Sequence, residues 1–564
     1  MLPLHHYPEP AKTFSLRKTL CSGRGIVISG IFTTILLIWL VAPVPYDRLK
    51  EGMGVGGAKA PSTHIRPPPA HKPAGNGSAI WDTRKGEVRA AFVHAYSGYM
   101  KHAFPSDELL PKSGGKTNKY NSWGMTTIDS MDTMWIMGLN EQFTQAMEYV
   151  ATLNFTTEPQ YYTPFFETVI RYLGGLLSAH AVSQDPILLA RADDLGKLLL
   201  PAFNTPSGLP AYSVNLRSGK TGSGWAGDAL LFSEFTSCQL EYKYLAKITG
   251  RKEYYTAAER VMELLYKLDP KDGLFATRWS TEGKPLDSKY RMQIFGTLDA
   301  HGLSLSALFH LKSIEGVINT LLYTTPSREL LYVGSTSGGN AAHTLEHLAC
   351  FLPGILALGA HAIPASLLAE KTREHHRWAA AGLAYTCYVS YADQRSGLGP
   401  DELQMVPGAK WVDSVRKWER GGRSGGVPPG LREAGTKPDG QREYWGNGKS
   451  YLLRPETVES LYVMWKTTGD VKWRERGYEI FSAIERHTRT PYGYASVNNL
   501  DSDTVYQIDD MPSFFLAETL KYLYLLFDDD NAYPIEKWVF NTEAHPLPVF
   551  EWTPWEKKAY KITA

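Results

Sequence analysis

The sequence is poor in cysteine, with four residues in a chain of 564. So few cysteines exclude a fold held together by disulfides, and no Cys-x-x-Cys pair has the spacing of a zinc finger. The chain also lacks an excess of either charge, because 59 Lys and Arg stand against 58 Asp and Glu. Basic residues are interspersed with acidic ones and form no broad basic field, so we predict no nucleic-acid partner.

One long apolar run is present, at residues 25–45 (GIVISGIFTTILLIWLVAPVP), and it contains no charge. Its length is close to the ~20 residues that a bilayer-spanning helix needs. Basic residues before it predict a cytoplasmic tail over 1–24 and a lumenal remainder, so we interpret 25–45 as a type II signal anchor. A cleaved signal peptide with a long leader is the alternative. The Gly- and Pro-rich residues 46–79 predict a flexible stem, which leaves 80–564 as the folded domain.

Helical periodicity dominates the folded domain, where apolar residues recur at i, i+3 and i+4. The helices predicted from this pattern span residues 84–102, 141–153, 165–182, 186–200, 226–249, 253–268, 314–322, 345–358, 365–384, 451–467, 473–487 and 514–526. Short aromatic turns and longer loops join them, and residues 416–441 predict a polar surface loop. This pattern indicates an all-α domain of stacked helical hairpins, closed into one toroid.

Acidic residues occur within several of the apolar helices, where an unpaired charge is costly unless it faces a wet cavity. Glu167 and Arg171 lie four residues apart on one predicted face, which an i,i+4 ion pair explains equally well. Glu456 and Glu459 lie three residues apart, and like charges at this spacing repel each other. Glu518 interrupts an apolar stretch, although a solvent-facing stripe would also contain it.

A polar turn near the C-terminus adds a hydroxyl and a further acid, Thr542 and Glu543. Each acid taken singly has a structural explanation. Taken together, acids in apolar helices without matching lysines favour a cavity lined by carboxylates. Because pairs of carboxylates are the catalytic groups of glycosidases, the residues point to hydrolysis of a glycosidic bond.

Nine segments carry a resemblance to a known family and occur in that family's order. They are HAYSGYMKHAFPSDELLP, NSWGMTTIDSMDTMWIMGL, FETVIRYLGGLLSA, LLPAFNTPSGLP, TLEHLACFLPG, GLGPDE, LLRPETVES, SFFLAETLKYLYLLF and FNTEAHPL. On these segments the chain resembles class I α-1,2-mannosidases of the fungal ER/Golgi type, glycoside hydrolase family 47, over nearly all of residues 88–546.

The resemblance implies an (α/α)7 barrel with short β-hairpins, which binds calcium near its floor. It implies an enzyme that removes terminal α-1,2-linked mannose from high-mannose N-glycans of glycoproteins with inversion of configuration. It also implies the lumen of the ER or Golgi, where a single-pass type II anchor would hold the enzyme to the membrane.

The family's catalytic roles carry over to matching positions. Glu167 corresponds to the general acid, which acts through a water, and Glu456 to the general base. Glu402, in GLGPDE, corresponds to a further catalytic carboxylate, and its neighbour Asp401 leaves that assignment open by one position. Thr542 would bind calcium through its hydroxyl and its carbonyl, with waters held by nearby acids completing a shell of oxygen ligands.

Two further sets of residues follow from the resemblance. The positions that match the family's sugar contacts are Arg171, Glu234, His347, Arg454, Glu459, Phe514, Glu518 and Glu543. Cys350 and Cys387 match the family's disulfide, which an oxidising lumen permits, against the alternative of two buried thiols. Cys238 is expected as a core thiol, and Cys21 on the cytoplasmic side of the anchor.

One segment departs from the family. Ahead of KSIEGVINTLLY the family carries Asp-Ser-x-Tyr-Glu-Tyr-Leu, whose Asp is its third catalytic carboxylate. Residues 291–313 hold a single acid, Asp299, without the Tyr-Glu-Tyr that should follow, so Asp299 is an out-of-register candidate and Asp287 a weaker one. Either the carboxylate has been lost or a splicing or reading-frame error affects this segment. The abrupt return of the match at Lys312 favours the error.

Two other functions stay open at this point. A lumenal, lectin-like protein would bind mannose glycans with the same barrel and calcium but without turnover, which the missing motif would explain. A different (α/α)-barrel glycosidase would share the architecture, although FNTEAHPL and RPETVES favour family 47.

Overall fold

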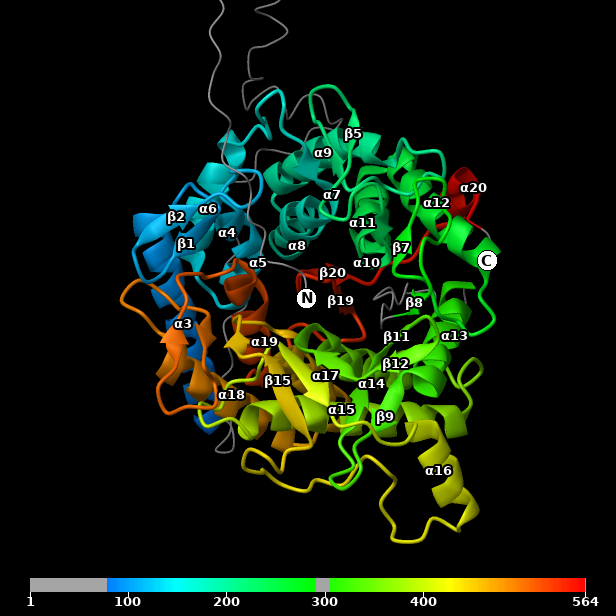
Figure 1. Ribbon diagram of the computed structural model, residues 1–564. Helices are drawn as coiled ribbons and strands as arrows, with labels where there is room; N and C mark the ends of the chain where they lie inside the picture. The colour runs from blue at the N-terminus through cyan, green and yellow to red at the C-terminus, as the bar shows by residue number, and fades with distance from the viewer. Residues whose placement is uncertain (1–78, 291–304, 563–564) are drawn as a thin grey trace, which may run out of the picture. The chain divides into compact units, whose positions relative to one another are not determined.

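Helices make up most of the computed structural model of the chain, which describes residues 79–290 and 305–562 (Figure 1). The predicted helical fold with short strands is confirmed for these residues. They belong to one unit, Pro67–Ala564. The predicted tail, the anchor and all but the last residue of the stem lie outside the described residues. No helix within the described ranges is long and apolar enough to span a bilayer.

Most helices follow the apolar periodicity of the sequence. They are α3 (Ala79–His102), α4 (Met125–Asp129), α5 (Met131–Ile136), α6 (Asn140–Thr152), α7 (Phe165–Glu167), the π-helical η1 (Thr168–Leu173), α8 (Gly174–Ser183), α9 (Pro186–Leu199), the 3-10 turn η2 (Leu200–Phe203), α10 (Phe232–Thr236), α11 (Gln239–Thr249), α12 (Lys252–Leu268), α13 (Leu305–Thr320), the 3-10 turn η3 (His347–Phe351), α14 (Leu352–Ala362), α15 (Glu370–Ala392), α16 (Trp411–Arg420), α17 (Glu456–Thr468), α18 (Lys472–Thr488), the π-helical η4 (Phe515–Thr519), α19 (Leu520–Leu526) and α20 (Pro554–Tyr560). Gly250 and Gly469 end α11 and α17 in the left-handed conformation that glycine adopts without strain.

Consecutive helices pack on each other as hairpins. Helix α5 packs on α6, α8 on α9, α11 on α12, α14 on α15 and α17 on α18, while α3 packs on α19. One helix of each pair also touches a helix of a neighbouring pair, along two arcs, α5 to α8 to α11 and α14 to α17 to α19. In Figure 1 the helices surround the β19–β20 hairpin. The predicted stacking of helical hairpins is therefore present.

Helix α13 has no preceding partner among the described residues. The ring of its Phe309 lies 5.3 Å from the ring of Tyr266 in α12, and its Glu315 lies 2.9 Å from His376 in α15. Helices α12 and α15 each come second in their hairpins. Because α13 contacts both of them, it occupies the position of the second helix of a hairpin. The described helix before it is α12, which already pairs with α11. The chain between α12 and α13 includes residues 291–304, which lie outside the described residues.

Short antiparallel sheets join the helices. They pair β1 (Glu108–Leu110) with β2 (Gly115–Thr117); β4 (Ser213–Val214) with β3 (Thr163–Pro164) and β5 (Thr221–Gly222); β6 (Leu230–Leu231) with β7 (Arg278–Trp279); β11 (Ser335–Ser337) with β8 (Lys289–Tyr290) and β12 (Asn340–Ala342); β9 (Leu322–Thr324) with β10 (Leu331–Val333); β14 (Glu402–Met405) with β13 (Thr344–Glu346) and β15 (Tyr444–Gly448); β17 (Val497–Asn498) with β16 (Ser450–Tyr451) and β18 (Tyr506–Gln507); and β19 (Trp538–Phe540) with β20 (Pro546–Pro548). Each sheet has two or three strands.

Four of the predicted helices extend too far toward the N-terminus. Residues 226–231, 345–351, 365–369 and 451–455 form turns, short strands or a 3-10 turn instead. A short apolar run fits a strand as well as a buried helix, so periodicity alone misplaces these starts. Helices α4 and α5 are not predicted, because every residue in them is buried and no exposed polar face alternates with an apolar one. The surface loop expected over 416–441 begins only after α16 ends at Arg420.

Cysteine pairing follows the prediction. A disulfide joins Cys350 in η3 to Cys387 in α15, with their Cα atoms 5.9 Å apart. Cys238 is a buried free thiol in the core, also as predicted. Cys21 lies outside the described residues.

Candidate active site

The β19–β20 hairpin carries Thr542 and Glu543 at its tip. The side chain of Asn541 holds this tip, because its Oδ1 accepts hydrogen bonds from the backbone N–H groups of Glu543 at 2.9 Å and His545 at 2.8 Å. Its Nδ2 donates to the carbonyl of Ile170 in η1 at 3.0 Å. Thr542 is exposed, whereas Glu543 is buried. The tip is therefore a fixed loop that presents Thr542 and turns Glu543 inward.

A fully buried ionic network supports the tip. His545 lies 2.8 Å from Asp132 through Nδ1 and 3.1 Å from Asp129 through Nε2, and Nζ of Lys521 lies 2.8 Å from Asp132. Lys521 also donates to the carbonyl of Ala544 at 2.6 Å. Burial opposes ionisation of Asp132, but the charges of Lys521 and His545 outweigh it and lower its pKa to about 2. Charges thus join α5 and α19 to the hairpin.

Replacing Lys521 by Met is expected to lower the free energy of unfolding by about 3–5 kcal/mol, because the buried charge of Asp132 loses one of its cationic partners. Denaturant titration followed by circular dichroism measures this change. Lys271→Met, in an exposed turn, is the matched control and should change the free energy by less than about 0.5 kcal/mol. If the Lys521→Met protein is as stable as the control, the network does not hold the hairpin.

Arg171 connects Glu167 with the hairpin tip. Its Nε donates to Glu167 at 2.9 Å, which is the i,i+4 pair expected from the sequence, and its Nη1 bonds Glu543 and, at 3.3 Å, the hydroxyl of Ser513. Arg171 belongs to η1, and π-helical segments recur at functional sites. The side chain of Glu167 stays 24% exposed. A buried guanidinium therefore links an accessible carboxyl group to the hairpin.

Glu456 begins α17 and is held as a carboxylate. Nδ1 of His347 lies 2.7 Å from its Oε2, and Nε2 of His347 lies 2.6 Å from the hydroxyl of Tyr391. Nη1 of Arg454 lies 3.9 Å from its Oε1. Burial opposes ionisation, but the His347 hydrogen bond and the charges of His347 and Arg454 outweigh it and lower the pKa of Glu456. An ionised carboxylate is the form that a general base requires.

The two adjacent acids of GLGPDE differ in their contacts. Oδ1 of Asp401 accepts a hydrogen bond from Nε of Arg454 at 2.5 Å, and its carbonyl accepts one from the backbone N–H of His347 at 2.8 Å. Glu402 begins β14, which pairs with β13. Arg454 therefore connects Asp401 with Glu456. The sequence leaves open whether Asp401 or Glu402 is the further catalytic carboxylate.

Three further buried carboxyl groups, those of Glu459, Glu518 and Glu543, have raised pKa values. Burial, followed by the charge of Glu456, raises the pKa of Glu459 to about 8. Burial and the charges of Glu543, Glu456 and Glu459 raise the pKa of Glu518 well above its usual value. Burial also raises the pKa of Glu543, although Arg171 opposes the rise. The acids that interrupt apolar helices in the sequence therefore form one cluster of mutually repelling groups.

This cluster has the donor chemistry of a site for a hard cation. Carboxylates and a threonine hydroxyl supply oxygen, the ligand that calcium prefers. A divalent charge would relieve the repulsion that raises the pKa values of Glu459 and Glu518. Within the described residues, no group of three or more His, Cys, Asp and Glu side chains could by itself hold a metal ion. The oxygens of Thr542 and of water are further ligands of the kind that calcium accepts.

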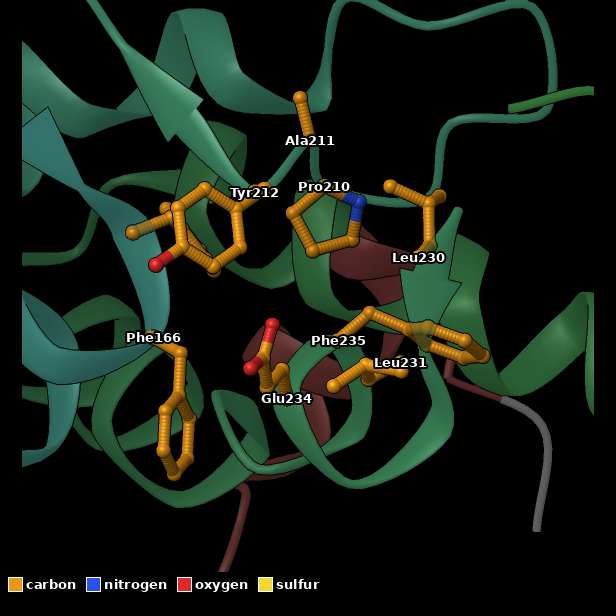
Figure 2. A pocket seen from close by; sticks show the side chains of 9 residues that line it. Phe166, Pro210, Ala211, Tyr212, Leu230, Leu231, Glu234 and Phe235 are labelled. Atoms are coloured by element: carbon orange, nitrogen blue, oxygen red, sulfur yellow. The ribbon is translucent and has the colours of Figure 1, made fainter. Parts of the chain in front are cut away.

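Glu234 reaches the site from α10. Figure 2 shows its carboxyl group in an apolar and aromatic pocket, near Phe166 and Tyr212. Burial, followed by the charge of Glu167, raises the pKa of Glu234 to about 8. The pocket therefore adjoins the predicted general acid.

The predicted residues fall into two groups. One group interacts with Arg171 or Glu167 and consists of these two residues with Glu234, Phe514 and Glu543. The other group is centred on Glu456 and includes His347, Asp401, Arg454, Glu459 and Glu518. The ring centre of Phe514 lies 5.9 Å from the guanidinium carbon of Arg171. The charge of Glu543 acts on Glu518 and so links the groups. Asp299 lies outside the described residues, and Asp287 lies beside β7, where its Oδ1 is 3.5 Å from the backbone nitrogen of Arg278.

Several supporting residues are missed by the sequence reasoning. They are Asp129, Asp132, Tyr391, Lys521 and His545. The segment NSWGMTTIDSMDTMWIMGL places two acids among apolar residues, so the signal that singled out Glu518 would also have found Asp129 and Asp132. Tyr391 carried no such signal, because a tyrosine in an apolar helix is ordinary core.

The chain is similar to known proteins of one family. Residues 91–549 match the family described as glycosyl hydrolase family 47. The chain is 37% identical to an endoplasmic reticulum mannosyl-oligosaccharide 1,2-alpha-mannosidase of Homo sapiens over 84% of this chain, and it spans only 64% of that relative's length. It is 35% identical to a mannosyl-oligosaccharide 1,2-alpha-mannosidase of Arabidopsis thaliana, over 83% of this chain and 79% of the relative. The solved structure of an alpha-1,2-mannosidase from Trichoderma reesei matches with a TM-score of 0.72 at 30% identity, covering 83% of this chain and 99% of that one.

Proposed function

Because the chain belongs to glycosyl hydrolase family 47, we propose that it removes terminal α-1,2-linked mannose from high-mannose N-glycans. The observation that carries the proposal is the lowered pKa of Glu456, because His347 and Arg454 stabilise this side chain in the ionised form that a general base requires. Relatives named as mannosidases favour hydrolysis over a lectin-like protein without turnover. Incubation with a high-mannose N-glycan, followed by chromatography for free mannose, tests the proposal. Folded protein that releases no mannose would exclude it.

In the proposed reaction the configuration at the anomeric carbon is inverted. Inverting glycosidases keep two carboxyl groups roughly 6.5–9.5 Å apart, which leaves room for a water on the face of the sugar opposite the leaving group. Glu456 takes a proton from that water, and His347 and Arg454 stabilise the carboxylate until it does so. Glu167 delivers a proton through a second water to the glycosidic oxygen, which leaves with the rest of the glycan. The α-linked mannose is released as β-mannose.

Calcium is part of the same proposal. The residues that would hold it are Thr542, through its own oxygens, and Glu459, Glu518 and Glu543, through water. When bound, a calcium ion would supply positive charge and coordination positions that sugar hydroxyls could occupy. The support for this assignment is the burial of the three glutamates, which together with neighbouring negative charge raises the pKa of each, and the exposed Thr542 next to Glu543.

The proposed architecture is the (α/α)7 barrel. Within residues 79–290 and 305–562, six helix pairs and α13, which has no preceding partner there, support it, because one more first helix ahead of α13 would complete the seventh pair. The missing family motif, with its third carboxylate, would fall at that place. Sequencing the transcript across the codons for residues 286–312 tests this assignment. A reading frame that encodes Asp-Ser-x-Tyr-Glu-Tyr-Leu supports it, and a transcript identical to the present sequence means that the carboxylate is lost.

The proposed location is the ER or Golgi membrane, with the catalytic domain in the lumen. Asn154, Phe155 and Thr156 form an N-glycosylation sequence after α6, and Asn154 is exposed. In protein expressed through a eukaryotic secretory pathway, peptide-N-glycosidase is expected to shift the electrophoretic mobility. Asn76 begins a second such sequence, Asn-Gly-Ser. Asn154→Gln should therefore remove that shift in an Asn76→Gln background, whereas Asn140→Gln, outside any such sequence, should not. Wild-type protein without a shift would contradict the lumenal location.

A further inference from the structure

Trp225 lies at the tip of a tight turn between β5 and β6. Gly224 and Gly227 exchange backbone hydrogen bonds of 3.1 and 3.0 Å, so only Trp225 and Ala226 lie between them. A side-chain nitrogen of Arg278 in β7 donates to the carbonyl of Ala226 at 3.1 Å and anchors the turn. The backbone that carries the indole ring is therefore fixed.

One edge of the Trp225 ring is tied to the candidate active site. Its indole N–H donates to the carboxyl group of Glu234, whose pKa is in turn affected by the charge of Glu167. Trp225 nevertheless remains 40% exposed. A ligand that covers a large apolar surface next to a site gains binding free energy, because apolar surface is removed from water. The hydrogen bond thus fixes the orientation of a ring that is still open to a ligand.

The turn also lies against two tyrosines. A Cβ atom on Gly224 would come within 2.3 Å of the Tyr212 ring, and one on Gly222 within 2.7 Å of the Tyr162 ring, so glycine at both positions permits this close approach. Tyr162 is 39% exposed. Tyr212 lines the pocket that holds Glu234, as Figure 2 shows. Aromatic side chains therefore continue from the Glu234 pocket to the surface.

We propose that Trp225 is a stacking platform for a saccharide beyond the first one on the leaving-group side of the scissile bond, and so selects extended high-mannose glycans over short ones; this inference rests on the proposed function. Glu234 connects Trp225 with Glu167, because its carboxyl group accepts the indole hydrogen bond and is affected by the charge of Glu167. One face of a mannose ring presents mostly C–H groups, which an aromatic face covers well. Because Glu234 orients the ring before the sugar arrives, little freedom is lost on binding.

Equilibrium binding tests the platform without turnover. In a Glu456→Gln background, Trp225→Ala is expected to weaken the affinity for a high-mannose N-glycan by about tenfold, which isothermal titration calorimetry measures. The affinity for α-1,2-mannobiose, which has only one saccharide on the leaving-group side, should stay nearly unchanged. Trp225→Phe keeps a ring and should lose much less. Trp555→Ala, on α20 at a 68% exposed position, is the control and should bind both sugars as the background does.

Three outcomes would overturn the proposal. Glycan affinity that Trp225→Ala leaves unchanged removes the platform. An equal loss in Trp225→Phe assigns the effect to the hydrogen bond with Glu234, and an equal loss for mannobiose assigns it to a disturbed site. Hydrolysis is measured separately on protein with Glu456 intact. Absence of hydrolysis with a preserved Trp225 effect on binding would remove the proposed function and leave the platform standing.

Discussion

Replacing Glu456 by Gln is expected to lower kcat for mannose release by roughly 10²–10⁴-fold, the range for loss of a general base. The amide has nearly the same shape as the carboxylate but does not accept a proton from the attacking water. KM should change little, because the substitution removes an interaction that acts in the transition state. Initial rates over a range of high-mannose glycan concentrations separate the two constants.

A matched substitution elsewhere controls for a general loss of glutamate. Glu475 in α18 pairs with Arg84 and its side chain is 48% exposed, so Glu475→Gln should keep wild-type kinetics. Thermal unfolding of both variants checks that they fold. A Glu456→Gln protein that retains more than a tenth of wild-type kcat would contradict the role of Glu456.

Removing calcium is expected to abolish hydrolysis and to lower Tm. An ion that binds only the folded state stabilises it by RT ln(1 + [L]/Kd), which is about 2.7 kcal/mol when the free ion exceeds Kd a hundredfold. Without the ion, nothing offsets the burial and the neighbouring negative charge that raise the pKa values of Glu459, Glu518 and Glu543. Differential scanning fluorimetry with a chelator and with added calcium measures the shift. Magnesium should not restore it, because that ion demands a smaller octahedral shell.

Removing the hydroxyl of Thr542 tests whether calcium raises Tm by binding at this residue. Thr542→Val keeps the shape of the side chain but removes one proposed ligand, so more calcium should be needed for half of the rise in Tm. Thr152→Val, at an exposed position at the end of α6, should respond as wild type does. A wild-type Tm that does not depend on calcium, or a Thr542→Val protein with an unchanged response, would contradict the proposed site.

Long amphipathic helices are the part of the fold that the sequence predicts best. Helices α9 and α12 keep a polar face along their whole length, and their observed bounds lie within one residue of those expected. The starts of α14 and α17 are misplaced because short strands and a 3-10 turn precede them in equally apolar sequence. Helices α4 and α5 have no solvent-facing side, so burial erases the pattern that prediction needs.

The sequence predicts the acidic residues of the candidate site well, but it predicts much less well which residues they contact. The Glu167–Arg171 pair is local, and its spacing reveals it. By contrast, His347 meets Glu456 across 109 positions of sequence, and Arg454 meets Asp401 across 53. Such contacts depend on how helices pack, which residue spacing does not encode. The π-helical turns that carry Arg171 and Glu518 likewise leave no periodic trace.

The stereochemistry of the released sugar tests the central claim most directly. Calcium-loaded protein is mixed with a high-mannose N-glycan, and proton NMR follows the anomeric signals before mutarotation scrambles them. The account predicts β-mannose as the first product, because Glu456 directs water to the face opposite the leaving group. First appearance of α-mannose, or no mannose from folded protein, would contradict it.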